Sequence, residues 1–311
     1  MNKSKPLVSI LIPVYNREKI ILETIQSAKN QTYQNIEIII VDNCSTDATY
    51  EVVYDEARKD SRIKVFQNEE NLGPVKNLKK CLEHSKGEYI KILWSDDQIL
   101  KDYIEKTLPF LMNDMEIGFV YTSTIIYFET GKKRKAYRFG ETGEYETKAF
   151  IKAHLFGEKH VPVSPGNALF RRKDIEKNLL IDINNPKKLD FSRYGAGNDL
   201  LIFLFTAASY SKFGFIDENL SFFRAHKNSF SISYDLDEYY TYSKVYFLNN
   251  IFKYKKDREV YFQYLYCLKK KYRYMIEEEQ KNKLLFFKCK YLFIYLFKKF
   301  IQKLNKKIRR K

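Results

Sequence analysis

Residues 36–43 read Ile-Glu-Ile-Ile-Ile-Val-Asp-Asn, and this stretch decides the fold. Its first six residues are nearly all β-branched, which favours a β-strand. A near-continuous apolar run of this length is typical of a strand that is buried on both faces, as in a parallel sheet covered by helices. An acid and an amide, Asp42 and Asn43, follow directly where the strand is expected to end.

The same kind of strand recurs on either side of this stretch and alternates with segments whose apolar residues have helical spacing. Predicted strands cover residues 7–12, 36–41, 62–66 and 89–93, and predicted helices cover residues 17–30, 46–58 and 74–85. Pro13 is expected to stop the first strand, and Ser45 or Thr46 to cap the second helix. This order predicts an α/β fold with an open, mostly parallel sheet flanked by helices.

The chain changes character after residue 235. Residues 117–235 mix strand-like runs, at 117–128 and 167–171, with loops and one apolar helix at 200–208. From residue 236 on, Tyr, Phe, Lys and Leu dominate while Gly and Pro are absent, so only helices are expected. We therefore predict an α/β domain over residues 1–235 and a basic, aromatic-rich helical region over residues 236–311.

Charge is distributed unevenly along the chain. The 311 residues carry a net charge of +16, and residues 241–311 account for all of it, with 21 Lys and Arg against five Asp and Glu. The first 240 residues carry 34 residues of each sign, and after Glu279 there are twelve Lys or Arg and no acid. Such a tail is expected to bind a polyanion, either an anionic bilayer or a nucleic acid.

Composition and motif content exclude several classes of protein. A hydrophobic content of 44% supports a packed core and excludes wholesale disorder. The four Cys show no CxxC or CxxH spacing, which excludes a disulfide scaffold and a zinc ribbon and indicates a reducing compartment. There is no GxGxxG motif, no P-loop motif and no run of eighteen apolar residues. We also expect no signal peptide, since the first apolar run is only five residues long.

Three of the predicted strands are followed in turn by an aromatic loop, by an acid with an amide neighbour and by an acid pair. The first strand is followed by residues 13–16, the second by residues 42–43, and the fourth by Asp96 and Asp97. In an open parallel sheet, ligands bind beyond the carboxyl ends of the strands. Adjacent carboxylates repel one another, so this acid pair indicates a divalent ion, and oxygen ligands favour Mg²⁺ or Mn²⁺. These residues predict a metal-assisted site for a nucleotide diphosphate. The alternative is that the acid pair caps a helix that begins near Ile99.

These motifs resemble those of family 2 glycosyltransferases, which have the GT-A fold, and they occur in the family's order and spacing over about residues 6–100. They read Val-Ser-Ile-Leu-Ile-Pro-Val-Tyr-Asn at 8–16, Gln-Thr-Tyr at 31–33, Glu-Ile-Ile-Ile-Val-Asp-Asn-Cys-Ser-Thr-Asp at 37–47, Asn-Leu-Gly at 71–73 and Ser-Asp-Asp at 95–97. Weaker matches follow at residues 165–171, 198–199 and 223–226. Residues 236–311 are not covered by the resemblance.

The resemblance implies an inverting transfer of a sugar from a nucleotide-diphosphate sugar to an acceptor hydroxyl. It implies that Asp199 is the general base, and that Asp97, assisted by Asp96 and His226, binds Mn²⁺ or Mg²⁺. Lys76, which follows the Asn-Leu-Gly motif, is placed where it could reach a phosphate. The residues assigned to the nucleotide sugar are Pro13, Val14, Tyr15, Asn16, Asp42, Asn71, Lys76, Asp96 and Arg224.

Other interpretations of single residues stay open. Asp199 could instead cap the helix at 200–208, His226 could be an ordinary loop histidine, and Lys76 could be a solvated helix lysine. The sequence also departs from the family pattern. Trp94, the only Trp, stands where many relatives carry the first Asp of the metal motif, and Asn198 replaces the Glu that usually precedes the base.

Together these features predict a glycosyltransferase of bacterial surface-polysaccharide type. We expect a UDP-sugar donor, a glycan or lipid-linked acceptor, and a cytoplasmic enzyme held peripherally on the inner face of the cell membrane. Residues 284–308 are predicted to form an amphipathic helix on that anionic surface, the alternative being that its apolar stripe packs on the catalytic domain or in a dimer. The oligomeric state is left open.

Three other functions compete with this prediction. A nucleotidyltransferase is the weakest of them, because the sequence shows no basic, Gly-rich nucleotide loop. A catalytically weak scaffold that only binds nucleotide sugars is suggested by Trp94 and Asn198. A nucleic-acid-binding protein that uses the basic tail is disfavoured because residues 1–240 carry no net charge and the acids at the strand ends would be left unexplained. We therefore expect no nucleic-acid partner.

Overall fold

The structure is a computed structural model that describes residues 5–157, 160–226 and 234–251. It comprises two compact units, Met1–Lys244 and Val245–Lys311, and the first contains every candidate site residue. The predicted domain boundary at residue 235 stays a prediction, and the predicted amphipathic helix at 284–308 lies outside the described residues. None of the helices in the described ranges combines the length and the hydropathy needed to cross a bilayer.

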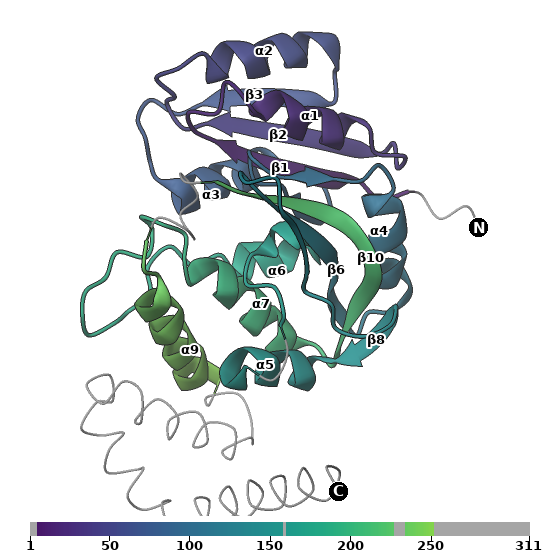
Figure 1. Cartoon of the computed structure of the whole chain (residues 1–311), viewed down its shortest axis with the longest axis vertical. Coiled ribbons are helices and arrows are strands. Elements are labelled where there is room, and N and C mark those ends of the chain that lie inside the picture. The colour runs from purple at the N-terminus through teal and green to yellow at the C-terminus, as the bar shows by residue number, and fades with distance from the viewer. Residues whose placement is uncertain (1–4, 158–159, 227–233, 252–311) are drawn as a thin grey trace, which may run out of the picture. The chain divides into compact units, whose positions relative to one another are not determined.

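A ten-stranded sheet organises the first unit (Figure 1). Its strands are β1 (Val8–Val14), β2 (Ile36–Asp42), β3 (Ile63–Gln67), β4 (Tyr89–Ile92), β5 (Gln98–Ile99), β6 (Ile117–Phe128), β7 (Lys133–Ala136), β8 (Gly143–Glu146), β9 (Ala168–Arg171) and β10 (Lys212–Ala225). The main path runs β3-β2-β1-β4-β9-β6-β10-β5, with β7 paired to β6 and β8 paired to β10. Strands β3, β2, β1 and β4 are parallel, β9 is antiparallel to both neighbours, and β6 and β10 are parallel to one another.

Helices connect and cover these strands, which confirms the predicted α/β class. They are α1 (Ile21–Lys29), α2 (Thr49–Lys59), α3 (Pro74–His84), α4 (Tyr103–Asn113), α5 (Thr147–Phe156), α6 (Arg172–Asn178), α7 (Asn198–Ser209) and α9 (Asp237–Ile251), with a 3₁₀ turn at Pro165–Asn167. The strands and helices predicted for the first 93 residues are all present, with ends that differ by up to four residues.

The central strands are buried on both faces, as the run at 36–43 predicted. Every residue of β1 and β2 is buried. Side chains that alternate along a strand point to opposite faces of the sheet. Ile10 and Ile38 accordingly pack in one core cluster with residues of α1, α2 and α4. Leu11 and Ile39 pack in a second cluster with residues of α3, α5, α6 and α7.

One predicted strand end is wrong, and the alternative interpretation of the acid pair as a helix cap is excluded. Strand β1 continues through Pro13 to Val14, because β4 pairs with β1 only as far as Leu11 and the missing N–H of proline is not needed on that side. No helix begins near Ile99, which instead belongs to β5 and pairs with β10. Helix α4 starts only at Tyr103, so the acid pair does not cap it.

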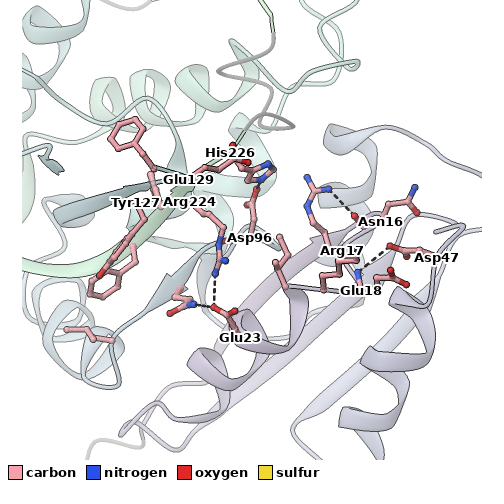
Figure 2. A pocket seen from close by; sticks show the side chains of 17 residues that line it. Asn16, Arg17, Glu18, Glu23, Asp47, Asp96, Tyr127, Glu129, Arg224 and His226 are labelled. Atoms are coloured by element: carbon pink, nitrogen blue, oxygen red, sulfur yellow. Dashed lines mark hydrogen bonds and ion pairs between the residues drawn. The ribbon is translucent and has the colours of Figure 1, made fainter. Parts of the chain in front are cut away.

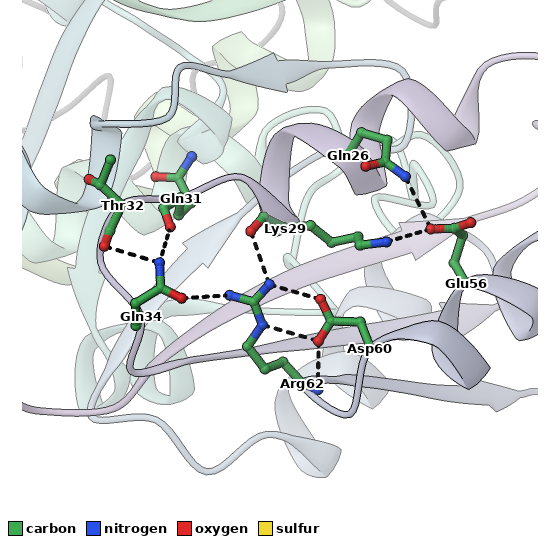
Figure 3. Close-up of polar contacts among 8 residues, drawn as sticks. All are labelled: Gln26, Lys29, Gln31, Thr32, Gln34, Glu56, Asp60 and Arg62. Atoms are coloured by element: carbon green, nitrogen blue, oxygen red, sulfur yellow. Dashed lines mark hydrogen bonds and ion pairs between the residues drawn. The ribbon is translucent and has the colours of Figure 1, made fainter.

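A polar network fastens the helices beside the edge of the sheet (Figure 3). Arg62 donates to both carboxylate oxygens of Asp60, at 3.1 and 2.8 Å, to the Lys29 carbonyl at 3.0 Å and to Gln34 Oε1 at 3.4 Å. Lys29 Nζ also donates to Glu56 at 2.8 Å. The network therefore links the end of α1 to α2 and to the turns before β2 and β3.

A buried carboxylate joins the amino-terminal ends of the central strands. Glu37 accepts hydrogen bonds from Ser9 Oγ at 2.7 Å, from Lys64 Nζ at 2.8 Å and from Gly87 N at 3.1 Å. Burial raises the pKa of Glu37, but the hydrogen bonds from Lys64, Lys86 and Ser9 outweigh it and leave that pKa below its usual value. Gly87 packs closely here: a Cβ at this position would lie 2.5 Å from Ser9 Oγ and 2.6 Å from Ser9 N.

We predict that Gly87→Ala lowers the free energy of unfolding by about 1–3 kcal/mol, because the backbone of β1 must move to admit the methyl group. Urea denaturation measures the effect. Gly143→Ala is the matched control, since a Cβ at Gly143 meets nothing within 4 Å. Equal stability of the two variants would contradict the close packing of Gly87 against Ser9.

Candidate active site

A cavity of about 990 Å³ opens where β1, β6 and β10 end (Figure 2). Asn16 and Arg17, which follow β1, lie on one side of it, and Asp96, Arg224 and His226 lie on the other. The carboxyl ends of parallel strands are where ligands bind in α/β sheets. The structure therefore brings together four of the predicted site residues, Asn16, Asp96, Arg224 and His226, around one cavity.

The loop after β1 is tied to the loop after β2. Asn16 has a φ of 49°, its N–H donates to Ser45 Oγ at 2.9 Å, and Thr46 N donates to Asn16 Oδ1 at 2.8 Å. Ser45 donates through its N and Oγ to Asp42, at 3.0 and 2.5 Å. The expectation that Ser45 or Thr46 caps α2 is wrong, because the N-cap is Ala48, and the two hydroxyl residues fasten the cavity wall instead.

Three predicted donor-site residues have buried side chains. Pro13 and Val14 are both buried in β1, so any contact they make with a nucleotide would come from the backbone. Asp42 is 0% exposed and also accepts a hydrogen bond from Gln67 Nε2 at 3.0 Å. Tyr15, by contrast, is 38% exposed. Their predicted contacts with a donor stay predictions.

Asn43, which follows β2, organises the neighbouring loop. Its side chain donates to Asn71 Oδ1 at 2.7 Å and accepts from Asn68 Nδ2 at 2.9 Å and from Leu72 N at 3.0 Å. An amide can both donate and accept here, whereas a carboxylate could only accept. Asn71 is thereby held in the loop, and Lys76 is exposed on α3.

The two adjacent acids occupy different environments. Asp96 Oδ2 lies 2.9 Å from His226 Nε2, and these side chains are 18% and 13% exposed. Asp97 is 6% exposed, and its Oδ1 accepts a hydrogen bond from Arg224 N at 3.0 Å. The Arg224 guanidinium donates to the Asp96 carbonyl at 3.3 Å and to Glu23 at 2.7 Å. Asp96 therefore faces the cavity, and Asp97 holds the end of β10.

Burial perturbs the proton affinities of two groups near this point. Burial, and then the charge of Asp96, raise the pKa of Asp97 well above its usual value. Lys91 on β4 is fully buried, donates to the Gly166 carbonyl and lies 4.2 Å from the centre of the Tyr103 ring. Burial lowers the pKa of Lys91 to about 7, although the charge of Asp97 acts in the opposite direction. Both side chains thus have a weakened preference for their charged forms.

Asp96 and His226 are the pair best placed to hold a divalent cation. The parts of the chain that the structure describes contain no group of three or more His, Cys, Asp or Glu that could hold an ion. Mg²⁺, however, is commonly bound by one or two protein ligands together with phosphate oxygens of a substrate. A carboxylate and an imidazole at the cavity wall fit that kind of site, in which a diphosphate completes the coordination.

Trp94 has a packing role in place of the acid found in many relatives. Its indole Nε1 donates to Ser164 Oγ at 2.7 Å. A Cβ at Gly166 would lie 2.7 Å from Trp94 Cδ1, so only glycine fits beside the ring without a shift. Trp94 therefore packs against the 3₁₀ turn that leads into β9.

Asp199 lies in the first turn of α7, after Gly197, whose φ is 91°. Its Oδ1 accepts hydrogen bonds from Gly197 N at 2.8 Å and Leu200 N at 2.6 Å, and its Oδ2 accepts one from the Tyr240 hydroxyl at 3.1 Å. Burial outweighs these bonds and raises the pKa of Asp199 to about 7. The carboxylate thus supports the start of the helix and also has the neutral-range pKa that suits a general base.

Sequence reasoning missed several residues around these groups. Tyr137, with a φ of 63°, has a pKa raised by burial and also by the charges of Asp97 and Asp199, so it lies within electrostatic reach of both. Nothing in its Lys-rich surroundings indicated this position. Lys91 was detectable, since it interrupts the apolar run at 89–93. Tyr240 was not, because it lies beyond every motif.

Comparison with known proteins identifies the family. The sequence model of glycosyl transferase family 2 matches residues 9–179, which include β1 to α6 and the acids at 96 and 97. The chain belongs to glycosyl transferase family 2. This confirms the resemblance of the sequence motifs.

Individual relatives of this family 2 glycosyltransferase match over part of their length. An uncharacterized glycosyltransferase of Haemophilus influenzae is 43% identical over 109 residues, which is 35% of this chain and 44% of that protein. TuaG of Bacillus subtilis, provisionally named a teichuronic acid biosynthesis glycosyltransferase, is 38% identical over 131 residues, which is 42% of this chain and 52% of TuaG. The chain thus matches about half the length of these relatives.

Solved structures confirm the predicted GT-A fold. The crystal structure of residues 1–349 of S. aureus TarS in complex with UDP-GlcNAc is similar with a TM-score of 0.65 and 20% identity. The similarity covers 89% of this chain and 78% of that one.

We predict that Asp199→Asn stabilises this family 2 glycosyltransferase at alkaline pH. The pKa of Asp199 is about 7 in the folded protein against an ordinary 3.8, so folding favours the protonated form. The protonated side chain therefore contributes stability that is fully present below the ordinary pKa of 3.8, and this stability is lost as the pH rises through the folded-state pKa of about 7. Asn cannot ionise, so the variant does not lose this stability as the pH rises.

The variant should therefore melt above the wild type at pH 8, with a smaller difference at pH 5. Thermal unfolding across this range measures it. A difference that does not change with pH would show that the Asp199 charge is not desolvated.

Proposed function

We propose that the chain is an inverting glycosyltransferase that transfers a sugar from a UDP-sugar to a hydroxyl of a glycan or lipid-linked acceptor in surface-polysaccharide synthesis. The observation that carries the proposal is the cavity at the strand ends, which Asp96, Arg224 and His226 line. Asp199, whose pKa is raised to about 7 by burial, lies in the same compact unit but is not among the lining residues. Family membership and the provisional name of TuaG support the reaction class and the pathway type.

The residues present suit an inverting displacement. The acceptor oxygen attacks the anomeric carbon as the bond from that carbon to the diphosphate breaks, and the bonding electrons leave with the nucleoside diphosphate. Asp199 accepts the proton that the attacking hydroxyl loses. The guanidinium of Arg224, at the cavity wall, offsets the negative charge that grows on the departing diphosphate.

The donor assignment and the cation rest on separate observations. TarS, which shares the fold, has been solved with UDP-GlcNAc and with UDP, and this supports a UDP-sugar as the donor. Asp96 and His226 would hold Mn²⁺ or Mg²⁺, with Asp97 next to them. When bound, the ion supplies positive charge that stabilises the leaving diphosphate.

We predict that UDP raises the melting temperature more than other nucleoside diphosphates, and that Mn²⁺ enlarges the shift. A ligand that binds only the folded state stabilises it by mass action. Asp96→Asn should remove the enlargement by Mn²⁺. Asp199→Asn should keep the full shift but lower the rate of sugar transfer by about 10²–10⁴-fold, because the proton acceptor is lost. Thermal-shift and transfer assays measure the two effects.

The control is Asp102→Asn, which removes a carboxylate that pairs with Lys106 on α4, outside the cavity. It should leave both readouts unchanged. An equal shift with Mn²⁺ and with EDTA would contradict the metal site. If Asp199→Asn keeps more than about a tenth of the wild-type rate, Asp199 is not the general base and only stabilises the start of α7. Binding of UDP without transfer from any nucleotide sugar would favour the scaffold.

We further propose that the basic region at 236–311 holds the enzyme on the inner face of the membrane, where lipid-linked acceptors lie. The charge balance carries this proposal, since basic residues near an anionic surface contribute about 1 kcal/mol each.

The full-length chain should therefore float with vesicles that contain phosphatidylglycerol, and high salt should release it. Vesicles of phosphatidylcholine alone are the control and should not retain it. Retention on immobilised DNA at physiological salt, without flotation, would favour the nucleic-acid-binding alternative.

A further inference from the structure

The two oxygens of the Asp199 carboxylate are held differently. Oδ1 accepts two backbone hydrogen bonds from its own helix start, from Gly197 N and Leu200 N. Oδ2 accepts a single side-chain bond, from the hydroxyl of Tyr240 in the first turn of α9. A carboxylate oxygen offers about two acceptor positions. Oδ1 is therefore fully used, and Oδ2 has a position left for a proton.

Tyr240 thus bonds to the oxygen that is able to act as the base. It comes from outside the 9–179 segment that matches the family, on a helix about 40 residues beyond Asp199 along the chain. Burial, and then the charge of Asp199, raise the pKa of Tyr240 well above its usual value. The phenol therefore stays protonated over the whole working range and always donates.

We propose that Tyr240 is a positioning residue that fixes the Asp199 carboxylate in one orientation and stabilises its charged form. The proposal rests on the function proposed above, in which Asp199 is the base. A base that can rotate would present its free acceptor position to the acceptor hydroxyl only part of the time. The backbone bonds to Oδ1 and the phenol bond to Oδ2 together fix the plane of the carboxylate.

The same bond opposes the effect of burial on Asp199. Desolvation raises the pKa of Asp199, while hydrogen bonds to its charged form, the one from Tyr240 included, lower it. Among the residues that the structure describes, Tyr240 on α9 bonds to Asp199 and Tyr137 after β7 interacts with its charge, and both are neutral phenols at working pH. Tyr240 is therefore the side chain that keeps the base ionised near neutrality.

Tyr240→Phe tests this proposal, because it removes the hydroxyl and keeps the ring. The acidic limb of the pH–rate profile should move up by about one pH unit, as expected for one lost charge-assisted bond. The rate at pH 6 should then fall about tenfold, and the rate at pH 9 should change less than about twofold. Tyr242→Phe, on the same helix, is the matched control and should leave the limb in place.

A second readout does not depend on catalysis. The melting-temperature difference between a protein and its Asp199→Asn counterpart grows with pH until Asp199 is fully ionised. This melting-temperature difference should stop growing at a pH about one unit higher in the Tyr240→Phe background than in the wild-type background. Should Tyr240→Phe fail to fold, Tyr240→Leu removes the same hydroxyl with different packing and carries the same expectation.

The outcomes separate the two proposals. A uniform loss of rate across pH, or unmoved midpoints in both readouts, would overturn the role of Tyr240 while Asp199 remains the base. If the wild type transfers no sugar, the proposed function fails, and the melting-temperature midpoint still decides whether Tyr240 stabilises the Asp199 charge.

Discussion

Burial of the central parallel strands on both faces is the constraint on which the rest of the structure depends. Every residue of β1 and β2 is buried, and their aliphatic side chains pack in two helix-covered cores, so neither face of these strands is exposed to solvent. Polar groups are therefore confined to the strand ends. At one end, Glu37 ties the strands together through Ser9 and Gly87. At the other end, the loops that begin at Asp42 and after Val14 form the cavity wall.

The geometry of the site depends as much on the hydrogen bonds that hold the motif residues in place as on the motif residues themselves. Asp42 binds the backbone and hydroxyl of Ser45, which holds Asn16 at the cavity. Arg224 donates hydrogen bonds to both acids, from its backbone N–H to the Asp97 carboxylate and from its guanidinium to the Asp96 carbonyl. A motif residue of this family can therefore act indirectly, by fixing a loop at the cavity wall.

The first half of the fold could be predicted from the sequence of short segments. The spacing of apolar residues within a segment indicates a strand or a helix, and the polar residues that follow a strand indicate where it ends. The same reasoning failed at β5, since Gln98 and Ile99 form a strand only by pairing with β10, more than 100 residues away. Motifs likewise pointed to Asp96 and Arg224, which line the cavity, and to Asp199, whose role stays a prediction. They could not predict Tyr240, whose contact with Asp199 is created by the packing of α9 and leaves no periodic or spacing signal.

Asp199, the proposed base, shows why such contacts matter for a carboxylate beside a helix start. Burial alone would hold its proton too tightly for use at neutral pH, and full solvation would give a carboxylate too weakly basic to accept one. Two backbone amides and one phenol offset the desolvation and leave the pKa of Asp199 at about 7. The protein thereby loses some stability whenever Asp199 is charged, and the charged form is the one that can take a proton from an acceptor. Reactivity and folding thus make opposite demands on a single carboxylate, and the hydrogen bonds around it determine the balance between them.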